Sequence, residues 1–413
     1  MNILNLTDLT QHEAEAIDQE FNFANAFNQQ TQSSSQMDII TKLPEIWLDA
    51  KRTKQKDSNE KFIVTFYTTR GLKSALQPNN IMLHYAASIA IIHIANYLVK
   101  KRLSVSLIEP CFDSLFNVFK HLEVPIYPLK EELLHDGDSI YENLKKYIKT
   151  DAIFLVDPNN PTGFTTLGIK NQKIFAEIVR FCKDYNKLLI IDYCFANFLM
   201  YDDEVELYDT YQVLKESGIN YMAIEDTGKY WPIQNTKVAM LKVSDCLYEE
   251  MYSIYTAYIL SISPFILNLL SEYILESHRS QFSSTRYLLK KNQTILKETL
   301  EGTILHLPET MTKTCVAWCE IQDSSIKSTE LQEFLFQAKG VYILPGTFFY
   351  WSNHPQGEKY IRIALARDTD NFMQGMKLLK EGLEILKLEK SVWKTEELLI
   401  NSTKSPNLKT ANH

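Results

Sequence analysis

Three polar residues that could act together stand at the ends of three separate apolar runs. Asn160 lies in the turn Asp-Pro-Asn-Asn-Pro-Thr-Gly, Asp192 ends the run Leu-Leu-Ile-Ile-Asp, and Lys229 follows the run Tyr-Met-Ala-Ile. If each run is a strand of one parallel sheet, all three residues meet beyond its carboxyl edge, where open α/β sheets bind ligands. The pattern therefore predicts a site that combines an amide, an acid and a nucleophilic amine.

These residue types suit the cofactor pyridoxal 5'-phosphate (PLP). A lysine forms an imine with the cofactor, and burial readily lowers the pKa of its amine, so that the neutral form can react. An aspartate facing the pyridine nitrogen keeps the ring charged, and the ring then withdraws electrons from the α-carbon of the substrate. We expect Lys229 and Asp192 to be catalytic and Asn160 to face the ring oxygen. Singly, the three residues could also be a surface lysine, a helix cap and a plain turn.

The surrounding chain alternates between strand and helix patterns from about residue 78 to 265. Strands are expected at Ser104–Glu109, Ala152–Asp157, Leu188–Asp192 and Tyr221–Asp226, and helices at Ser88–Val99, Phe112–His121 and Ile169–Tyr185. This alternation implies right-handed crossovers and a mostly parallel sheet. The predicted fold class is therefore α/β.

The length of 413 residues, of which 45% are hydrophobic, allows a large domain and a smaller one. One or two long helices are expected after Pro264, leading to the second domain. The expected division is an N-terminal arm or lid (1–45), a large PLP-binding domain (46–270), a small C-terminal α/β domain (271–390) and a disordered tail (391–413).

The overall composition argues against several other functions. The net charge of −8 and the lack of a basic stripe disfavour nucleic-acid binding. No apolar run is long enough for a bilayer span, and the N-terminus does not resemble a signal peptide. The six scattered cysteines suit a reducing cytoplasm better than a disulfide framework or a metal site. We therefore expect a cytoplasmic protein without a metal, a membrane or a nucleic-acid partner.

The ordered motifs resemble those of the class I/II aminotransferases, PLP-dependent enzymes of fold type I with an aspartate aminotransferase-like fold. The matching residues are Asn160 before Pro-Thr-Gly, Asp192, Lys229 after Thr-Gly, and Arg362 in Tyr-Ile-Arg-Ile-Ala-Leu-Ala. The resemblance implies a homodimer that binds a small amino acid. It also implies that the planar guanidinium of Arg362 grips the substrate α-carboxylate.

The same resemblance implies further contacts to the cofactor. The segment Tyr-Ala-Ala-Ser opens the first long helix, and a helix N-terminus favours a phosphate. A basic residue eight positions after the lysine, here Lys237, would bind the same phosphate. The remaining residues expected at the cofactor are Ala86, Ala87, Ser88, Cys194 and Phe112, the last of which would stack on the ring.

Two positions depart from the ordinary aminotransferase pattern. Phe195 stands where a tyrosine donates to the ring oxygen, and Asp226 stands where a serine commonly binds the phosphate. Both departures recur in a narrower group, which the segment Ile-Glu-Asp-Thr-Gly-Lys-Tyr-Trp-Pro resembles. This group is the PLP- and O2-dependent L-arginine oxidases, which include the enduracididine-type arginine hydroxylases. The resemblance implies O2 as co-substrate, without flavin or metal.

In that group the N-terminal segment folds over the site as a lid. By match, Thr10, Glu13 and Asp226 would hold the substrate and its guanidinium. Asn25 stands where the hydroxylases have an aspartate on the guanidinium, and Phe27 where they have a histidine that helps to add water. These two differences favour oxidation over hydroxylation, and they leave open whether the substrate is L-arginine or a related basic amino acid.

Three functions therefore compete. The first is a PLP-dependent oxidase, either a desaturase or a hydroxylase, in a natural-product pathway. The second is a conventional aminotransferase that passes the amino group to a 2-oxo acid, and Phe195 argues against it. The third is a binding or regulatory protein with the same fold, which the retained Lys229, Asp192 and Asn160 disfavour.

Overall fold

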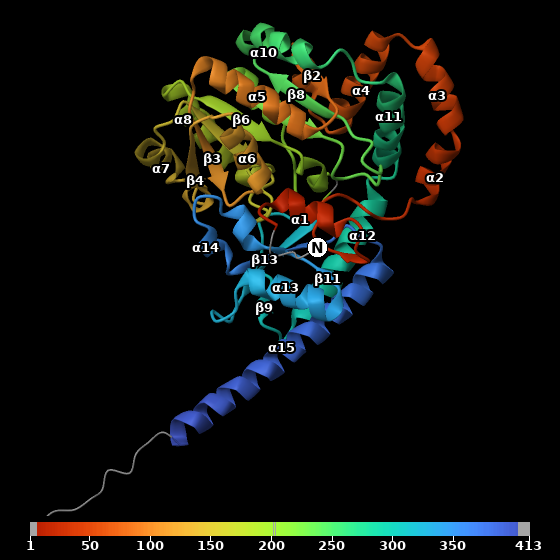
Figure 1. Cartoon of the computed structure of the whole chain (residues 1–413). Helices are drawn as coiled ribbons and strands as arrows, with labels where there is room; N and C mark the ends of the chain where they lie inside the picture. Colours follow the sequence, from red (N-terminus) through yellow and green to blue (C-terminus); the bar gives the residue numbers. More distant parts are fainter. Residues whose placement is uncertain (1–5, 201, 203, 404–413) are drawn as a thin grey trace, which may run out of the picture.

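A seven-stranded sheet forms the centre of the larger part of the computed structural model, which describes residues 6–200, 202 and 204–403 (Figure 1). The strand order is β2-β8-β7-β6-β5-β3-β4, and every neighbouring pair is parallel except those of β8 with β2 and β7. The strands are β2 (Ile81–His84), β3 (Val105–Glu109), β4 (Ile126–Lys130), β5 (Ala152–Val156), β6 (Leu188–Asp192), β7 (Tyr221–Asp226) and β8 (Ala239–Val243). The expectation of a mostly parallel α/β sheet is confirmed.

Helices pack around this sheet and bury one apolar face each. In α8, for example, Ile174, Phe175, Ile178 and Val179 recur at helical spacing and are all buried. The helices of this part are α4 (Gln55–Thr69), α5 (Ala87–Lys101), α6 (Asp113–His121), α7 (Ile140–Tyr147), α8 (Gln172–Asp184), α9 (Thr210–Ser217), α10 (Asp245–Tyr258) and α11 (Pro264–Arg279). Short 3-10 turns are η2 (Lys73–Leu76), η3 (Glu131–Leu134), η4 (Ile169–Asn171) and η5 (Ala196–Leu199).

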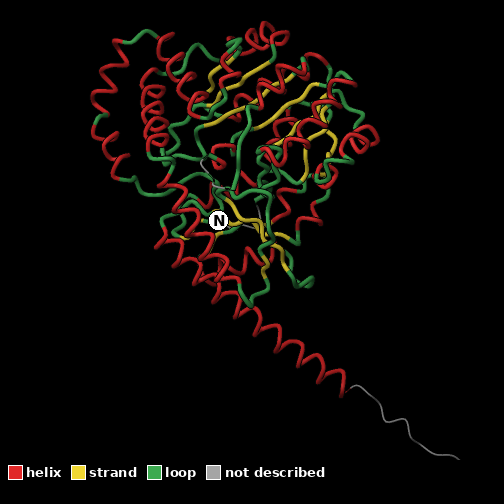
Figure 2. The backbone as a smooth tube through the Cα atoms, turned by 180° about the vertical axis from the view of Figure 1, so that it is seen from behind, coloured by secondary structure: helices red, strands yellow, loops and turns green. Residues whose placement is uncertain are grey.

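The smaller part holds an antiparallel sheet of order β12-β13-β10-β9. Its strands are β9 (Leu305–His306), β10 (Val316–Ile321), β12 (Leu344–Pro345) and β13 (Tyr360–Ala364). The helices and turns beside it are α12 (Ser283–Leu300), α13 (Ser328–Lys339), η6 (Gly346–Phe349), α14 (His354–Gly357) and α15 (Thr369–Thr403). The first part of α15 packs against α12 and α13, and its C-terminal end leads away from the rest of the chain, as seen from behind in Figure 2.

The N-terminal segment divides between the two parts. Helix α1 (Leu9–Ala16) buries Leu9 and Ala16 against aromatic residues of the smaller part, and β1 (Phe21–Asn22) pairs in parallel with β11 (Val341–Tyr342). Helices α2 (Ser34–Thr41) and α3 (Leu43–Arg52) instead lie beside α11 (Figure 1). Only the first piece of the expected arm therefore approaches the carboxyl ends of the central strands.

Two expected boundaries differ from the structure. Residue 270 falls inside α11, whose buried side chains, such as Leu267 and Tyr273, belong to the same hydrophobic core as the central strands. This core also includes Phe282. The expectation of a disordered tail is wrong for residues 391–403, which continue α15. This stretch lacks an apolar period, but its middle, Lys394 to Leu399, holds Lys, Glu and Leu, which are good helix formers. Residues 404–413 lie outside the described part of the chain.

Among the described residues, none of the helices has both the length and the apolar character that crossing a membrane would require. All six cysteines are free thiols. Within the same residues, no group of three or more His, Cys, Asp or Glu side chains is placed to hold a metal ion.

Candidate active site

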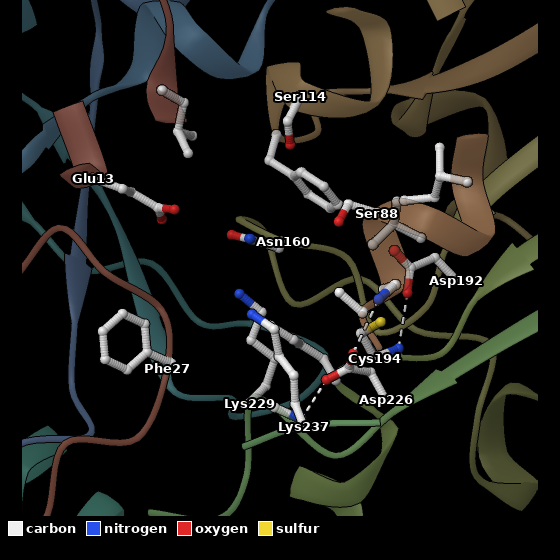
Figure 3. A pocket seen from close by; sticks show the side chains of 18 of the residues that line it. Glu13, Phe27, Ser88, Ser114, Asn160, Asp192, Cys194, Asp226, Lys229 and Lys237 are labelled. Carbon is white, nitrogen blue, oxygen red and sulfur yellow. Dashed lines mark hydrogen bonds between the residues drawn. The ribbon is translucent and has the colours of Figure 1, made fainter. Parts of the chain in front are cut away.

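A cavity of about 190 Å³ lies between the carboxyl ends of the central strands, helix α1 and strand β13 (Figure 3). The structure brings thirteen of the residues expected from the sequence to its lining: Glu13, Phe27, Ala86, Ala87, Ser88, Phe112, Asn160, Asp192, Cys194, Asp226, Lys229, Lys237 and Arg362. These residues come from separate stretches of the chain, so their convergence is a property of the fold.

Two expected residues do not line the cavity. Thr10 is exposed on the outer side of α1. Asn25 is buried, and its side chain has a structural role: Nδ2 donates to the backbone carbonyl of Glu13 at 2.9 Å, and Oδ1 accepts from Asn22. Neither side chain is placed to meet a ligand in this structure.

Other lining residues were not expected from the sequence. They are Leu9, Ile91, Ser114, Val118, Val156, Gly228 and Asn235, together with Phe195, which the sequence marks only as a departure from the family. Helical spacing could have found several of them, because residues three and four apart share a face. Leu9 lies one turn before Glu13, Ile91 one turn after Ala87, and Val118 one turn after Ser114.

Asp192 ends the central strand β6 with its carboxylate inside the site. The residue is 1% exposed, and Oδ1 accepts a hydrogen bond from the backbone N–H of Cys194 at 2.9 Å. Burial raises the pKa of this carboxyl; the Cys194 hydrogen bonds and the charge of Lys229 act in the opposite direction. A buried carboxylate of this kind gains from a cationic partner, and a protonated pyridine nitrogen would supply one.

Lys229 lies in a loop that is fixed by hydrogen bonds and by close packing. Thr227 exchanges hydrogen bonds with the backbone of Val238, and its side chain accepts from the Val238 N–H at 2.9 Å. A Cβ atom at Gly228 would come within 2.7 Å of both Asp226 Oδ1 and Lys237 Cδ, so a larger residue there would push these two side chains aside. The Thr-Gly-Lys motif is thus explained by close packing, which presents the Lys229 amine to the cavity.

Arg362 forms the opposite wall of the cavity. Its side chain, on β13, is fully buried, and Nη2 donates to Glu13 Oε1 at 2.9 Å and to the carbonyl of Ala24. Nη1 donates to Asn160 Oδ1 at 3.3 Å, while the buried Nε has no partner. An unsatisfied donor in a buried guanidinium is costly, and a ligand carboxylate would satisfy it.

The start of helix α5 forms an anion-binding corner. Ala86 precedes the helix without a side-chain cap of its own, and the backbone N–H groups at a helix N-terminus attract an anion. The Ala87 N–H donates to Asp226 Oδ2 at 3.3 Å, and Asp226 also accepts from the Gly228 N–H. Burial raises the pKa of the Asp226 carboxyl, whereas the Gly228 N–H and the charges of Lys229 and Lys237 lower it.

Together these groups fit PLP. The amine of Lys229 would hold the aldehyde carbon, Asp192 the ring nitrogen and Asn160 the ring oxygen, while the α5 N-terminus and Lys237 would hold the phosphate. The N-terminus of α5, which already attracts the Asp226 carboxylate, and Lys237 in the same lining favour a phosphate at this corner. The unpaired Arg362 Nε favours the carboxylate of a substrate. Phe195 is buried and has no hydroxyl to donate.

Comparison with known proteins agrees with this assignment. Residues 55–376 match the family described as aminotransferase class I and II, and the chain belongs to this family. No curated protein sequence matches the chain significantly. The expected fold-type-I, aspartate aminotransferase-like fold is therefore confirmed.

Solved structures of similar fold include one that is also similar in sequence. MppP, in a structure soaked with the product 2-ketoarginine, is 25% identical with a TM-score of 0.79, over 87% of this chain and 99% of that chain. The α-aminoadipate aminotransferase LysN of Thermus thermophilus is 13% identical (TM-score 0.74; 92% and 96% covered). The aspartate aminotransferase of Thermus thermophilus with maleate is 15% identical (TM-score 0.72; 92% and 97% covered). The last two share the fold alone.

Proposed function

We propose that this protein is a PLP-dependent oxidase that uses O2 to oxidise L-arginine or a related basic amino acid in a natural-product pathway. The observation that carries the proposal is the position of helix α1, which places the carboxylate of Glu13 against Arg362 inside the cavity. An N-terminal segment that contributes an acid to the site suits a substrate with a cationic side chain. The similarity to MppP over nearly all of that protein's length supports the same reading.

Each residue has a role in this proposal. Bound PLP supplies a ring that withdraws electrons from the amino acid and makes its C–H bonds acidic. The Lys229 amine takes the proton from the α-carbon, and the Asp192 carboxylate keeps the proton on the ring nitrogen. Arg362 binds the α-carboxylate with its planar fork. Leu9 and the rest of α1 cover the cavity and limit the entry of water.

The proposed reaction balances with O2 as the oxidant. The amino acid loses two protons and two electrons, and O2 takes them up as hydrogen peroxide. Water then hydrolyses the oxidised imine to a 2-oxo acid and ammonia. Phe195 supports this course over simple amino transfer, because it lacks the hydroxyl that the family usually provides. Phe27 faces the cavity with an apolar ring, which favours oxidation without hydroxylation of the substrate.

Mass analysis of the products tests this function. PLP-loaded protein is incubated in air with L-arginine and no 2-oxo acid, beside the Lys229→Ala variant. We expect a 2-oxo acid, or a product lighter by two hydrogens, from the wild-type protein alone. If products form only when a 2-oxo acid is added, and the amino group moves to it, the protein is a conventional aminotransferase and the oxidase proposal fails.

We also propose a homodimer in which the second copy covers the surface beside the phosphate corner. Tyr85 directly precedes the residues of that corner and is 42% exposed, and its hydroxyl donates to the Ser261 carbonyl. Tyr258 is 64% and Leu260 is 99% exposed near this contact. Light scattering on the full chain should give twice the monomer mass, and a monomer at micromolar concentration would contradict the proposal.

A further inference from the structure

The phosphate corner already contains an anion that belongs to the chain. Asp226 is 3% exposed and accepts the N–H of Ala87, the first residue of α5, as well as that of Gly228. The side chain is held in the charge field of Lys229 and Lys237. The carboxylate thus occupies the helix N-terminus and lies in the field of Lys237, the two features that a cofactor phosphate would need.

The contacts of Asp226 differ from those of Glu13, the acid at the opposite end of the cavity. Glu13 lies across the cavity from Asp226, with Asn160 between them (Figure 3). Arg362 donates to both Glu13 and Asn160. An acid that served only a cationic substrate side chain would be expected towards Glu13, where the N-terminal segment closes the cavity. The contacts of Asp226 are instead with the groups that attract an anion.

Two anions in one buried corner repel each other strongly, since the field of like charges is weakly screened there. A serine hydroxyl at this position can donate to a phosphate, whereas a carboxylate can only accept when ionised. A phosphate ester entering the corner must therefore displace the Asp226 carboxylate from the Ala87 N–H or share the field of Lys237 with it. Either event lowers the affinity for the phosphate.

We propose that Asp226 competes with the phosphate group of the cofactor for the N-terminus of α5, so that this chain binds PLP more weakly and more reversibly than its cofactor contacts alone would allow. The inference rests on the proposed use of PLP at Lys229. The carboxylate of Asp226 thus opposes the binding of phosphate monoesters as a class. When displaced by phosphate, the Asp226 side chain becomes available to a cation in the cavity.

The test compares PLP with pyridoxal, which has a hydroxymethyl group in place of the phosphate ester. Both aldehydes can form the imine with Lys229, so the imine absorbance of the full-length protein is titrated with each. The measured quantity is the ratio of the two affinities, compared between variants, so that the solution chemistry of each ligand cancels. The variants are Asp226→Ser, which restores a hydroxyl donor, and Asp226→Asn, which keeps the shape and removes the charge. Glu13→Gln removes a charge from the far end of the same cavity.

We expect both Asp226 variants to raise the PLP-to-pyridoxal affinity ratio by at least about tenfold, because only PLP carries the charge that Asp226 opposes. Glu13→Gln should leave this ratio unchanged. An unchanged ratio in Asp226→Asn, with weaker binding of L-arginine to the PLP-loaded variant, would overturn the inference and assign Asp226 to the substrate side chain. If the wild-type protein forms no imine with either aldehyde, the proposed use of PLP fails as well.

Discussion

The two ends of the cavity are built in different ways. At the cofactor end, Asp192 and Asp226 close the neighbouring parallel strands β6 and β7, and Lys229 follows within three residues. At the substrate end, Arg362 of β13 meets Glu13 of α1, and these two residues are 349 positions apart in the chain. The cofactor end is thus fixed by one sheet, whereas the substrate end exists only when α1 is docked. Changes at the first end should act on cofactor binding, and changes at the second on substrate binding.

The largest effect is expected from Lys229→Ala, which breaks the cofactor end alone. Without the amine, no imine can form, and the proton transfer at the α-carbon loses roughly 10²–10⁴-fold in rate. The visible imine absorbance after addition of PLP should be absent. Lys237→Ala is the matched control, since it removes a nearby positive charge and keeps the Lys229 amine, so that the imine should still form at a saturating concentration of PLP. An imine spectrum that survives in Lys229→Ala would refute the assignment.

Arg362→Lys should break the substrate end and spare the cofactor end. The variant keeps a positive charge but loses the fork, which costs about 1.5–3 kcal/mol and therefore about 10–100-fold in kcat/KM. We expect the imine absorbance to remain and the change to appear mainly in KM for the amino acid. Loss of the imine in this variant would show that the two ends are not separable.

The contact between α1 and Asp113 predicts that the free energy of unfolding depends on pH. The Leu9 N–H of α1 donates to Asp113 Oδ2 at 3.0 Å, and Asp113 Oδ1 is buried without a partner. Burial raises the pKa of Asp113 from 3.8 to about 7, helped by the charges of Asp8 and Glu13, while the Leu9 hydrogen bond and Arg362 oppose this shift. The folded protein then binds a proton more tightly than the unfolded chain between about pH 4 and 7. The contribution of Asp113 to the free energy of unfolding therefore falls as the pH rises through this window.

Asp113→Asn tests this dependence and keeps an acceptor for Leu9. The variant should match the wild-type protein near pH 4 and exceed its free energy of unfolding by about 1–3 kcal/mol at pH 8. Urea denaturation at a series of pH values measures the difference. Curves that stay parallel from pH 4 to 8 would show that Asp113 is not linked to the docking of α1.

The smallest effect is expected from Phe195→Tyr, which adds to the cofactor end the donor that ordinary aminotransferases have. Phe195 is buried, lines the cavity and packs edge-on against Phe198, with ring centroids 5.5 Å apart. We expect a shift of a few fold from oxidation towards amino transfer, roughly the 0.5–1.5 kcal/mol of one net hydrogen bond. The ratio of peroxide formed to amino group transferred, with a 2-oxo acid present, measures it. A ratio that rises would show that Phe195 does not limit amino transfer.

The cofactor end was largely predictable from the sequence, and the substrate end only in part. Asp192 and Lys229 follow apolar strands of regular length, so their common edge can be inferred from local patterns. Glu13 and Thr10 were both expected at the substrate, but Thr10 is exposed because Leu9 and Glu13 define the inner face of α1. Asn25 is used to fix the backbone at Glu13, a long-range detail without a local signal.

The most direct test of the central claim is oxygen uptake by PLP-loaded protein with L-arginine, in the absence of any 2-oxo acid. The proposed function predicts sustained uptake well above that of Lys229→Ala, with hydrogen peroxide or an oxidised amino acid formed in proportion. Uptake at the background level with L-arginine and with other basic amino acids, together with rapid amino transfer once a 2-oxo acid is added, would contradict the claim and identify a conventional aminotransferase.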